Sequence, residues 1–265
     1  MPHVAVGSRT LHYERRGSGQ PLLLIQGMAG HHRLWGEPFL RELERDFDVV
    51  AYDHRGVGAS TDLRDADFGI ADLAADAVML LDALGWDAAH VMGISMGGMV
   101  AQHLAVDHAP RLRSLVLGCT YPGGPGSTLA APGPVRMLQA IGLGNVDVAL
   151  RTAFAANLSR AFAASEAHFE QFREATLSVT VPVPVIMRQA KAAFGHDTSA
   201  RLPGVTVPTL VLHGTADEML DHANGERIAE LMPTATLHTF DGVGHLFWWE
   251  QPEATASLVR AHCLG

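Results

Sequence analysis

Residues 90–100 read HVMGISMGGMV, and this stretch decides the fold that we expect the chain to adopt. Its apolar start has the composition of a buried strand, and its end continues into a run with helical character. Between the two, Gly93 and Gly97 lie two residues before and two residues after Ser95. Small residues at these positions allow a sharp strand-to-helix turn that exposes the serine oxygen at the end of the strand. Ser95 is therefore the candidate nucleophile.

A serine hydroxyl is a weak nucleophile at neutral pH, so it needs a neighbouring base and an acid that orients the base. In a turn of this kind both partners follow the serine along the chain, the acid first and the histidine second. His245 is the candidate base because it lies on a glycine-bordered loop after the last strand-like run. Asp217 is the candidate acid because it follows the strand-like run 209–212, and Glu218 and Asp221 compete with it. An ordinary helix-capping role is the alternative for Asp217.

The charge that develops on a substrate carbonyl oxygen needs two backbone N–H donors aimed at it. One donor is Met96, the residue after the serine, which also begins a helix. The other is Met28, within residues 26–30 (QGMAG), which follow an early strand-like run. Gly27 in that loop allows a close approach of the backbone. A simple glycine turn at the end of the strand is the alternative interpretation.

Short apolar runs alternate with helix-like segments along most of the chain, which is typical of a mostly parallel sheet with helices on both faces. This alternation stops at a turn-rich stretch, 122–126, and the segments that follow it have helical spacing. We therefore predict an α/β core formed by residues 1–121 and 204–265, with residues 122–203 inserted as a helical lid. The strand-like runs are 22–25, 49–52, 90–94, 115–117, 209–212 and 236–240, an N-terminal hairpin is expected within 4–13, and the helical lid segments are 148–162 and 166–177.

The composition argues against several classes of protein. A chain of 265 residues can bury one large core, and its formal net charge is −9 with scattered basic residues, so nucleic acid is not an expected partner. The N-terminus lacks the pattern of a secretory signal, and no apolar stretch reaches the roughly 18 residues that a membrane span requires. We expect a cytoplasmic protein without a membrane span. The sequence does not indicate its oligomeric state.

Metal and dinucleotide sites are not predicted either. No His-Glu-x-x-His motif occurs, and no Gly-x-Gly-x-x-Gly follows a first strand. His31 and His32 are adjacent, so they point apart on a strand or a helix. The two cysteines cannot form a thiolate cage for zinc. We therefore expect no metal ligands.

Together these residues resemble the α/β-hydrolase superfamily over nearly the whole chain outside the lid. Residues 93–102 (GISMGGMVAQ) are similar to the enol-lactonase and carboxylesterase branch, and residues 52–60 (YDHRGVGAS) resemble a structural glycine-rich loop of the superfamily. Many relatives carry His-Gly where this chain has Gln26 and Gly27. The resemblance implies the α/β-hydrolase fold and a reaction through an acyl-enzyme that uses no cofactor.

The expected activity is that of a serine hydrolase that cleaves a carboxylic ester or a lactone. Alternatives that use the same three residues are hydrolysis of a carbon–carbon bond and cofactor-free perhydrolysis, and a non-catalytic binding module is the alternative from another class. The substrate is expected to be a small molecule with an apolar portion, because the lid is rich in apolar residues and apolar side chains flank the catalytic positions, namely Met28, Leu246, Phe247 and Trp248. A core role is the alternative for each of them. Gly27, Leu246 and Phe247 are the candidate substrate-binding residues. Scattered lid arginines are usually solvated, but four of them could meet a substrate carboxylate: Arg136, Arg151, Arg160 and Arg188.

Overall fold

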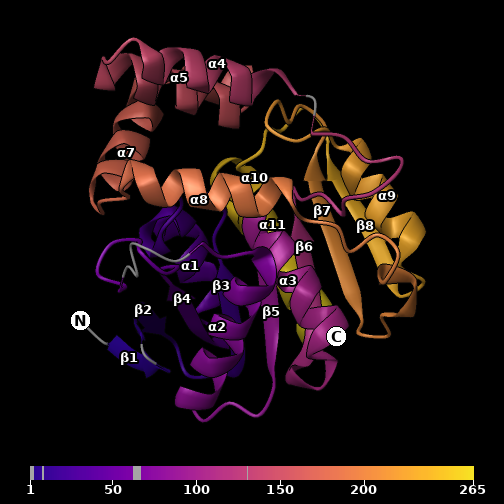
Figure 1. Cartoon of the computed structure of the whole chain (residues 1–265). Coiled ribbons are helices and arrows are strands. Elements are labelled where there is room, and N and C mark those ends of the chain that lie inside the picture. Colours follow the sequence, from indigo (N-terminus) through magenta and orange to yellow (C-terminus); the bar gives the residue numbers. More distant parts are fainter. Residues whose placement is uncertain (1–2, 8, 62–66, 130) are drawn as a thin grey trace.

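The computed structural model describes residues 3–7, 9–61, 67–129 and 131–265. Its centre is one eight-stranded sheet (Figure 1). The strands are β1 (His3–Val6), β2 (Arg9–Arg16), β3 (Gln20–Ile25), β4 (Phe47–Tyr52), β5 (Ala89–Ile94), β6 (Leu112–Gly118), β7 (Thr209–Gly214) and β8 (Ala235–Phe240). Their order across the sheet is β1-β2-β4-β3-β5-β6-β7-β8. Only the pairs β1–β2 and β2–β4 are antiparallel, so the predicted mostly parallel sheet with an N-terminal hairpin is confirmed.

Helices cover both faces of this sheet. The core helices are α1 (Glu37–Leu43), α2 (Ile70–Ala83), α3 (Met96–Asp107), α9 (Ala223–Leu231), α10 (Phe247–Glu250) and α11 (Pro252–Leu264), with short 3-10 turns η1 (His32–Trp35), η2 (Ala109–Arg111) and η3 (Leu202–Gly204). Successive strand residues point to opposite faces, so Leu23 belongs to the apolar cluster with α2 and α3, whereas Leu24 belongs to the cluster with α1 and α11. Both leucines are fully buried. Such a sheet, buried on both faces, explains the uninterrupted apolar runs in the sequence.

The helical insertion consists of α4 (Pro132–Gly142), α5 (Val146–Asn157), α6 (Arg160–Ala163), α7 (Glu166–Leu177) and α8 (Val183–Phe194). In Figure 1, α4 and α5 form the end of the molecule farthest from the sheet, and α8 lies closer to it. The lid has an apolar cluster of its own, formed by Leu150, Phe154, Leu158, Phe169 and Phe172. These side chains explain why the insertion folds as helices.

The predicted continuous helical segment 148–162 is wrong in one respect. Leu158 adopts an extended backbone and ends α5, and Ser159 begins α6 by accepting the N–H of Phe162 at 3.3 Å. The apolar spacing continues through this break because Leu158 still packs into the lid cluster. Among the described residues, no helix is long and apolar enough to cross a membrane.

Candidate active site

Ser95 lies on the turn between β5 and α3, at the carboxyl end of a central strand. Its backbone has a φ of 53° and a ψ of −122°, a conformation that is costly for a residue with a Cβ atom. The turn is so tight that a Cβ at Gly93 would collide with the carbonyl of Gly97. The N–H of Ser95 donates to the carbonyl of Gly118 at 2.9 Å, which ties the turn to β6. The turn therefore requires the small residues on either side of the serine.

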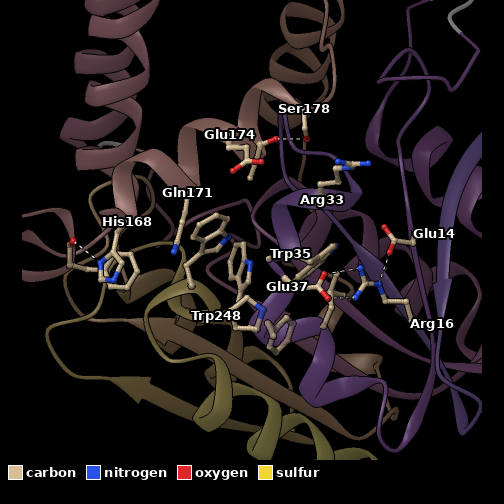
Figure 2. A pocket seen from close by; sticks show the side chains of 17 residues that line it. Glu14, Arg16, Arg33, Trp35, Glu37, His168, Gln171, Glu174, Ser178 and Trp248 are labelled. Atoms are coloured by element: carbon tan, nitrogen blue, oxygen red, sulfur yellow. Dashed lines mark hydrogen bonds and ion pairs between the residues drawn. The ribbon is translucent and has the colours of Figure 1, made fainter. Parts of the chain in front are cut away.

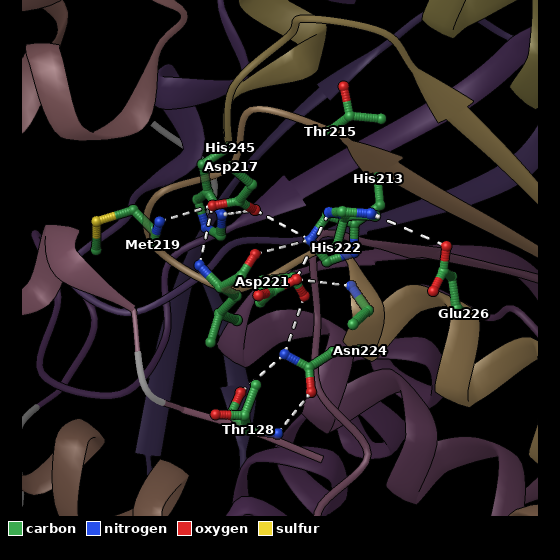
Figure 3. A network of polar contacts seen from close by, with 12 residues as sticks. Thr128, His213, Thr215, Asp217, Met219, Asp221, His222, Asn224, Glu226 and His245 are labelled. Carbon is green, nitrogen blue, oxygen red and sulfur yellow. Dashed lines mark hydrogen bonds and ion pairs between the residues drawn. The ribbon is translucent and has the colours of Figure 1, made fainter. Parts of the chain in front are cut away.

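Asp217 and His245 follow β7 and β8, so they lie at the same edge of the sheet as Ser95. Nδ1 of His245 is 2.6 Å from Oδ2 of Asp217, and both side chains are buried (Figure 3). Oδ1 of Asp217 accepts the N–H groups of Met219 at 2.7 Å and Leu220 at 2.9 Å. Asp217 thus caps its local turn and also orients a histidine. Because Nδ1 faces the carboxylate, Nε2 of His245 is the nitrogen available to a substrate or a nucleophile.

A second imidazole, that of His213 at the end of β7, contacts the same carboxylate. Its Nε2 lies 3.1 Å from Oδ2 of Asp217 and 3.0 Å from the carbonyl oxygen of Leu220. Both neighbours are acceptors, so Nε2 carries the proton and donates it. Nothing in the sequence distinguishes His213 among the fifteen histidines except its place four residues before Asp217, so its contact with the carboxylate was not predicted.

The charge state of Asp217 follows from these contacts. Burial raises the pKa of this carboxyl group, but the two imidazoles of His245 and His213 outweigh burial and lower the pKa below its ordinary value of 3.8. The carboxylate is therefore ionised at neutral pH. An ionised acid at this position stabilises positive charge on His245 when that ring accepts a proton.

Cys119, which follows β6, lies beside both Ser95 and Asp217. Burial raises the pKa of its thiol well above the ordinary value, the charge of Asp217 raises it further, and a backbone hydrogen bond with Ser95 opposes both. The ends of β5, β6 and β7 thus converge on one buried point. The structure brings the predicted serine and the predicted acid into the same neighbourhood.

The loop after β3 packs directly against the serine. A Cβ built on Gly27 would lie 3.0 Å from Cβ of Ser95, so a larger residue would require the serine to shift. Three N–H groups of the loop already have acceptors: that of Gly27 at 3.2 Å (Gln26 Oε1), that of Ala29 at 2.9 Å (Gln189 Oε1) and that of Gly30 at 3.1 Å (Gly27 O). The N–H of Met28 has no acceptor among the described residues.

Met96 provides the second predicted donor. It is the first residue of α3, and the N–H groups of Gly98 and Met99, further into the helix, donate to the carbonyl of Ser95 at 3.0 and 3.2 Å. The first N–H groups of a helix have no partner within the helix, so that of Met96 is available to a bound anion. Neither N–H group has an acceptor among the described residues, and their role as an oxyanion hole stays a prediction.

Gln189 on α8 connects the lid to this loop. Its side chain is fully buried, and its Oε1 accepts the N–H of Ala29, a residue with a φ of 58°. The Nε2 of the same amide has no hydrogen-bond partner among the described residues. The sequence analysis missed Gln189, because a single glutamine on a lid helix carries no recognisable pattern.

The lid also contacts the loop that carries His245. The N–H of Leu246 donates to the carbonyl of Asn157 at 2.9 Å, and Glu250 accepts the N–H groups of Gly244 at 2.9 Å and Ser159 at 2.8 Å. The lid therefore reaches the candidate base as well as the loop after β3.

The two apolar residues that follow His245 lie in different surroundings. Leu246 is half-buried and packs against the apolar cluster of the lid. Phe247, which was also predicted to contact substrate, is fully buried in the core and stacks on Phe240 with ring centroids 5.2 Å apart. The ring of Phe247 therefore packs in the apolar core.

The competing carboxylates do not approach the candidate base. Glu218 forms an exposed ion pair with the lid residue Arg136. Asp221 accepts the N–H of Ala223 at 3.0 Å and lies near His222 at the surface. Another predicted lid arginine, Arg151, pairs with Glu166 at 2.7 Å. These contacts leave Asp217 as the carboxylate that holds His245.

A large cavity lies between the lid helix α7 and the segments η1, α1 and α10 (Figure 2). Its volume is about 800 Å³, and the aromatic part of its wall includes Trp35, Trp248 and Trp249. Neither Ser95 nor His245 lines it. This cavity is therefore separate from the candidate active site.

A group of potential metal ligands is also separate from these residues. One ligand atom each from His12, His32 and Asp53 lies within 4.8 Å of the others. Nε2 of His31 lies 3.4 Å from the carbonyl oxygen of Thr176 on α7, whereas His32 faces Asp53, and the two ring centroids are 6.1 Å apart.

A serine on a strained strand-to-helix turn, followed along the chain by a buried acid and a histidine, is the site of a hydrolase. The chain belongs to the α/β hydrolase fold family, whose family model matches residues 20–252. It is 32% identical over 248 residues to the putative carbamate hydrolase RutD of Variovorax paradoxus, covering 89% of each chain.

Solved structures agree with this assignment. The esterase RhEst1 from Rhodococcus sp. ECU1013 superposes with a TM-score of 0.83 at 26% identity, covering 98% of this chain and 96% of the other. The enol-lactonase from Burkholderia xenovorans LB400 superposes with a TM-score of 0.85 at 24% identity over the whole of both chains. The second likeness shows the fold alone. The resemblance to the α/β-hydrolase superfamily is confirmed.

Proposed function

We propose that this hydrolase cleaves a carboxylic ester or a lactone through an acyl-enzyme on Ser95. The observation that carries the proposal is the 2.6 Å contact between Nδ1 of His245 and Oδ2 of Asp217, at the sheet edge where Ser95 projects from its turn. Oγ of Ser95 attacks the carbonyl carbon while Nε2 of His245 accepts the hydroxyl proton. Asp217 holds the ring and stabilises its positive charge.

The negative charge on the carbonyl oxygen is stabilised by the N–H groups of Met28 and Met96. His245 then returns its proton to the leaving oxygen, and the acyl group remains on Ser95. A water molecule, deprotonated by the same ring, hydrolyses the acyl-enzyme and restores the serine. No cofactor takes part in these steps.

An apolar acyl group fits the surroundings of these residues. The side chain of Met28 is 42% exposed, and that of Leu246 is half-buried between the core and the lid. Met28 itself provides a proposed oxyanion donor, and Leu246 follows the candidate base His245 directly. We therefore propose a small-molecule substrate with an apolar portion next to the scissile carbonyl.

The first experiment is hydrolysis of p-nitrophenyl esters of increasing acyl length by the wild-type chain and by Ser95→Ala. We expect the variant to lose about 10⁴-fold or more of kcat while its circular dichroism and Tm stay close to those of the wild type. The matched control is Ser18→Ala, which removes an exposed serine between β2 and β3. A fluorophosphonate should add its mass to the wild type and to the control but not to Ser95→Ala. Turnover by Ser95→Ala would rule out the mechanism, and absence of both turnover and labelling would favour a binding module.

A carbamate is the second candidate substrate, because a relative 32% identical to this chain is described as a putative carbamate hydrolase. The same residues would act. In a carbamoyl-enzyme, however, the neighbouring nitrogen donates electron density to the carbonyl carbon and makes it less electrophilic, so this intermediate is hydrolysed slowly. Matched p-nitrophenyl acetate and p-nitrophenyl carbamate distinguish the two substrates. Multiple turnovers of the carbamate at a kcat similar to that of the ester would favour carbamate hydrolysis, and a single burst would favour the ester.

A further inference from the structure

The group formed by His12, His32 and Asp53 joins three separate segments of the core. His12 lies on β2, His32 begins η1, and Asp53 follows β4 directly. All three residues are at most 5% exposed. We propose that they bind a divalent transition-metal ion, with zinc as the ion that best fits two imidazoles and one carboxylate. The site is structural and does not depend on the proposed esterase activity.

The contact between His32 and Asp53 supplies two of the ligands. Nδ1 of His32 lies 2.9 Å from Oδ1 and 3.0 Å from Oδ2 of Asp53, so one proton is shared between the ring and the carboxylate. The backbone N–H of His32 also donates to Oδ1 at 2.8 Å, which fixes the carboxylate independently of the ring. A divalent ion replaces the shared proton, binds one ring nitrogen and one carboxylate oxygen, and releases the proton to solvent.

His12 supplies the third ligand through one ring nitrogen. Its ring centroid is 4.7 Å from that of His32, and the two ring planes meet at 71°. The backbone of His12 is tied to the Asp53 loop, because its carbonyl accepts the N–H of Asp53 at 2.9 Å and its N–H donates to Ser60 Oγ at 2.9 Å. Neighbouring ligand atoms around tetrahedral zinc are about 3.4 Å apart, so small side-chain rotations bring atoms that lie within 4.8 Å to that spacing.

An ion can reach these ligands from a cavity of about 260 Å³ that His12, His32 and Asp53 line together. The lid segment 178–180 closes the other side of this cavity. A water molecule in the cavity completes a four-coordinate site.

The charges near the cluster favour a cation. Asp53 is a fully buried carboxylate, and Oε2 of Glu14 lies 3.9 Å from Nε2 of His32. Glu14 is itself paired with Arg16, and Arg33 lines the cavity with an exposed side chain. The negative charge within the cluster is therefore that of the buried Asp53 carboxylate.

Bound zinc would cross-link β2, η1 and the segment after β4. His32 lies two residues after Gly30, the last residue of the loop that packs against Ser95, so the ion would also anchor the end of that loop. We therefore expect zinc to raise the thermal stability of the whole chain, because an ion that binds only the folded state shifts the folding equilibrium.

The test is titration of the chelator-treated full chain with zinc chloride, followed by calorimetry in two buffers of different ionisation enthalpy. We expect one zinc per chain with a Kd of about 10 µM or tighter, release of a proton, and a rise in Tm of about 3 °C or more. Cobalt(II) in the same site should give the visible absorption of a tetrahedral ion. Failure of the wild type to bind one equivalent of zinc would overturn the proposal.

Variants assign the ligands. His12→Gln and His32→Gln should each weaken zinc binding at least tenfold and abolish the rise in Tm, and their Tm without zinc reports whether they fold. The matched control is His222→Gln, because His222 lies at the surface with Asp221 at 3.5 Å and Glu226 at 3.9 Å and offers an adventitious site. Retained binding in His222→Gln supports the buried site, whereas loss of binding in that variant alone would assign the ion to the surface. If His32→Gln does not fold, the cobalt spectrum of His12→Gln and of the wild type decides the question.

Discussion

Asp217 and Ala29 lie at two sides of the candidate active site, and the molecule holds them in different ways. The partners of Asp217 other than His245 are His213, Met219 and Leu220, all within four residues of it along the chain. The side-chain partner of Ala29 is Gln189, which is 160 residues away on a lid helix. The hydrogen bonds of the Asp217 carboxylate all come from the core, although the lid contacts the neighbouring Glu218. Core and lid together position the loop that carries the Met28 donor.

This difference indicates which part of the site depends on the lid. Contacts within one loop form whenever that loop folds, and they survive changes elsewhere. A contact between the core and an insertion is lost whenever the insertion shifts, and such regions open at a lower free energy than a buried sheet does. Changes around Asp217 should therefore act on the base, and changes around Ala29 should act on the stabilisation of the oxyanion.

The largest effect is expected for Asp217→Asn. The amide keeps the shape of the side chain but cannot stabilise the charged imidazole, so we expect kcat to fall about 10⁴-fold with little change in KM. Steady-state hydrolysis of the best p-nitrophenyl ester measures this loss. Glu218→Gln and Asp221→Asn are matched controls and should stay within about twofold of the wild type, because neither carboxylate contacts His245. A larger loss of kcat in Glu218→Gln or Asp221→Asn than in Asp217→Asn would assign the role of the acid to that residue instead.

A smaller loss is expected for His213→Leu, which removes one of the four groups that contact the Asp217 carboxylate. A hydrogen bond to a charged group contributes about 1.5–3 kcal/mol, so kcat should fall roughly 10- to 100-fold. His213→Gln retains an N–H donor at a similar distance and should recover most of the loss. Equal losses in the two variants would indicate that His213 acts through packing alone.

The effect of His213→Leu on thermal stability should depend on pH. A carboxyl group whose pKa is lowered by folding stabilises the native state at pH values above its unfolded pKa, here near 3.8, and this stabilisation is lost as the pH falls through the lower folded pKa. Removing His213 raises the folded pKa of Asp217. The Tm difference between the wild type and His213→Leu should therefore be constant near neutral pH and should shrink below about pH 4. A difference that does not change with pH would argue against this charge interaction.

The sequence predicted those parts of the fold and the site that depend on neighbouring residues. The alternation of apolar runs predicted the parallel sheet, and the spacing of Gly93, Ser95 and Gly97 predicted the turn because the backbone there tolerates no larger residue. Asp217 and His245 were predicted because each follows a strand-like run downstream of Ser95, in the chain order acid and then histidine. Their catalytic roles stay predictions until the variants are measured.

The remaining features depend on contacts between distant segments. Gln189 meets Ala29 only because α8 packs over the loop after β3, and no local spacing encodes that arrangement. The burial of Phe247 depends on its stacking with Phe240 across the sheet edge. The end of α5 at Leu158 was missed because the apolar period continues through the break.

Gln189→Met tests whether catalysis depends on the contact between the lid and the loop after β3. Methionine fills a similar volume but cannot accept the N–H of Ala29, so the loop and the Met28 donor should lose their fixed position. We expect kcat to fall about tenfold with KM nearly unchanged, since only the transition state carries the oxyanion. Affinity for a boronic acid that mimics this state should fall by the same factor. Gln171→Met, an exposed glutamine on α7, is the matched control, and an equal loss there would contradict a specific role for Gln189.

The smallest effect is expected for Asn145→Ala, which changes the lid far from Ala29. Asn145 is exposed and caps α5 by accepting the N–H of Val148 at 3.1 Å. Loss of such a cap costs about 1 kcal/mol, so Tm should fall by roughly 2–4 °C while kcat stays within twofold of the wild type. If kcat fell in parallel with Tm, any loosening of the lid would disturb the site. Unchanged kcat would mean that the cap of α5 does not affect catalysis, and a loss of activity in Gln189→Met could then be assigned to the contact of Gln189 with Ala29 rather than to a general loosening of the lid.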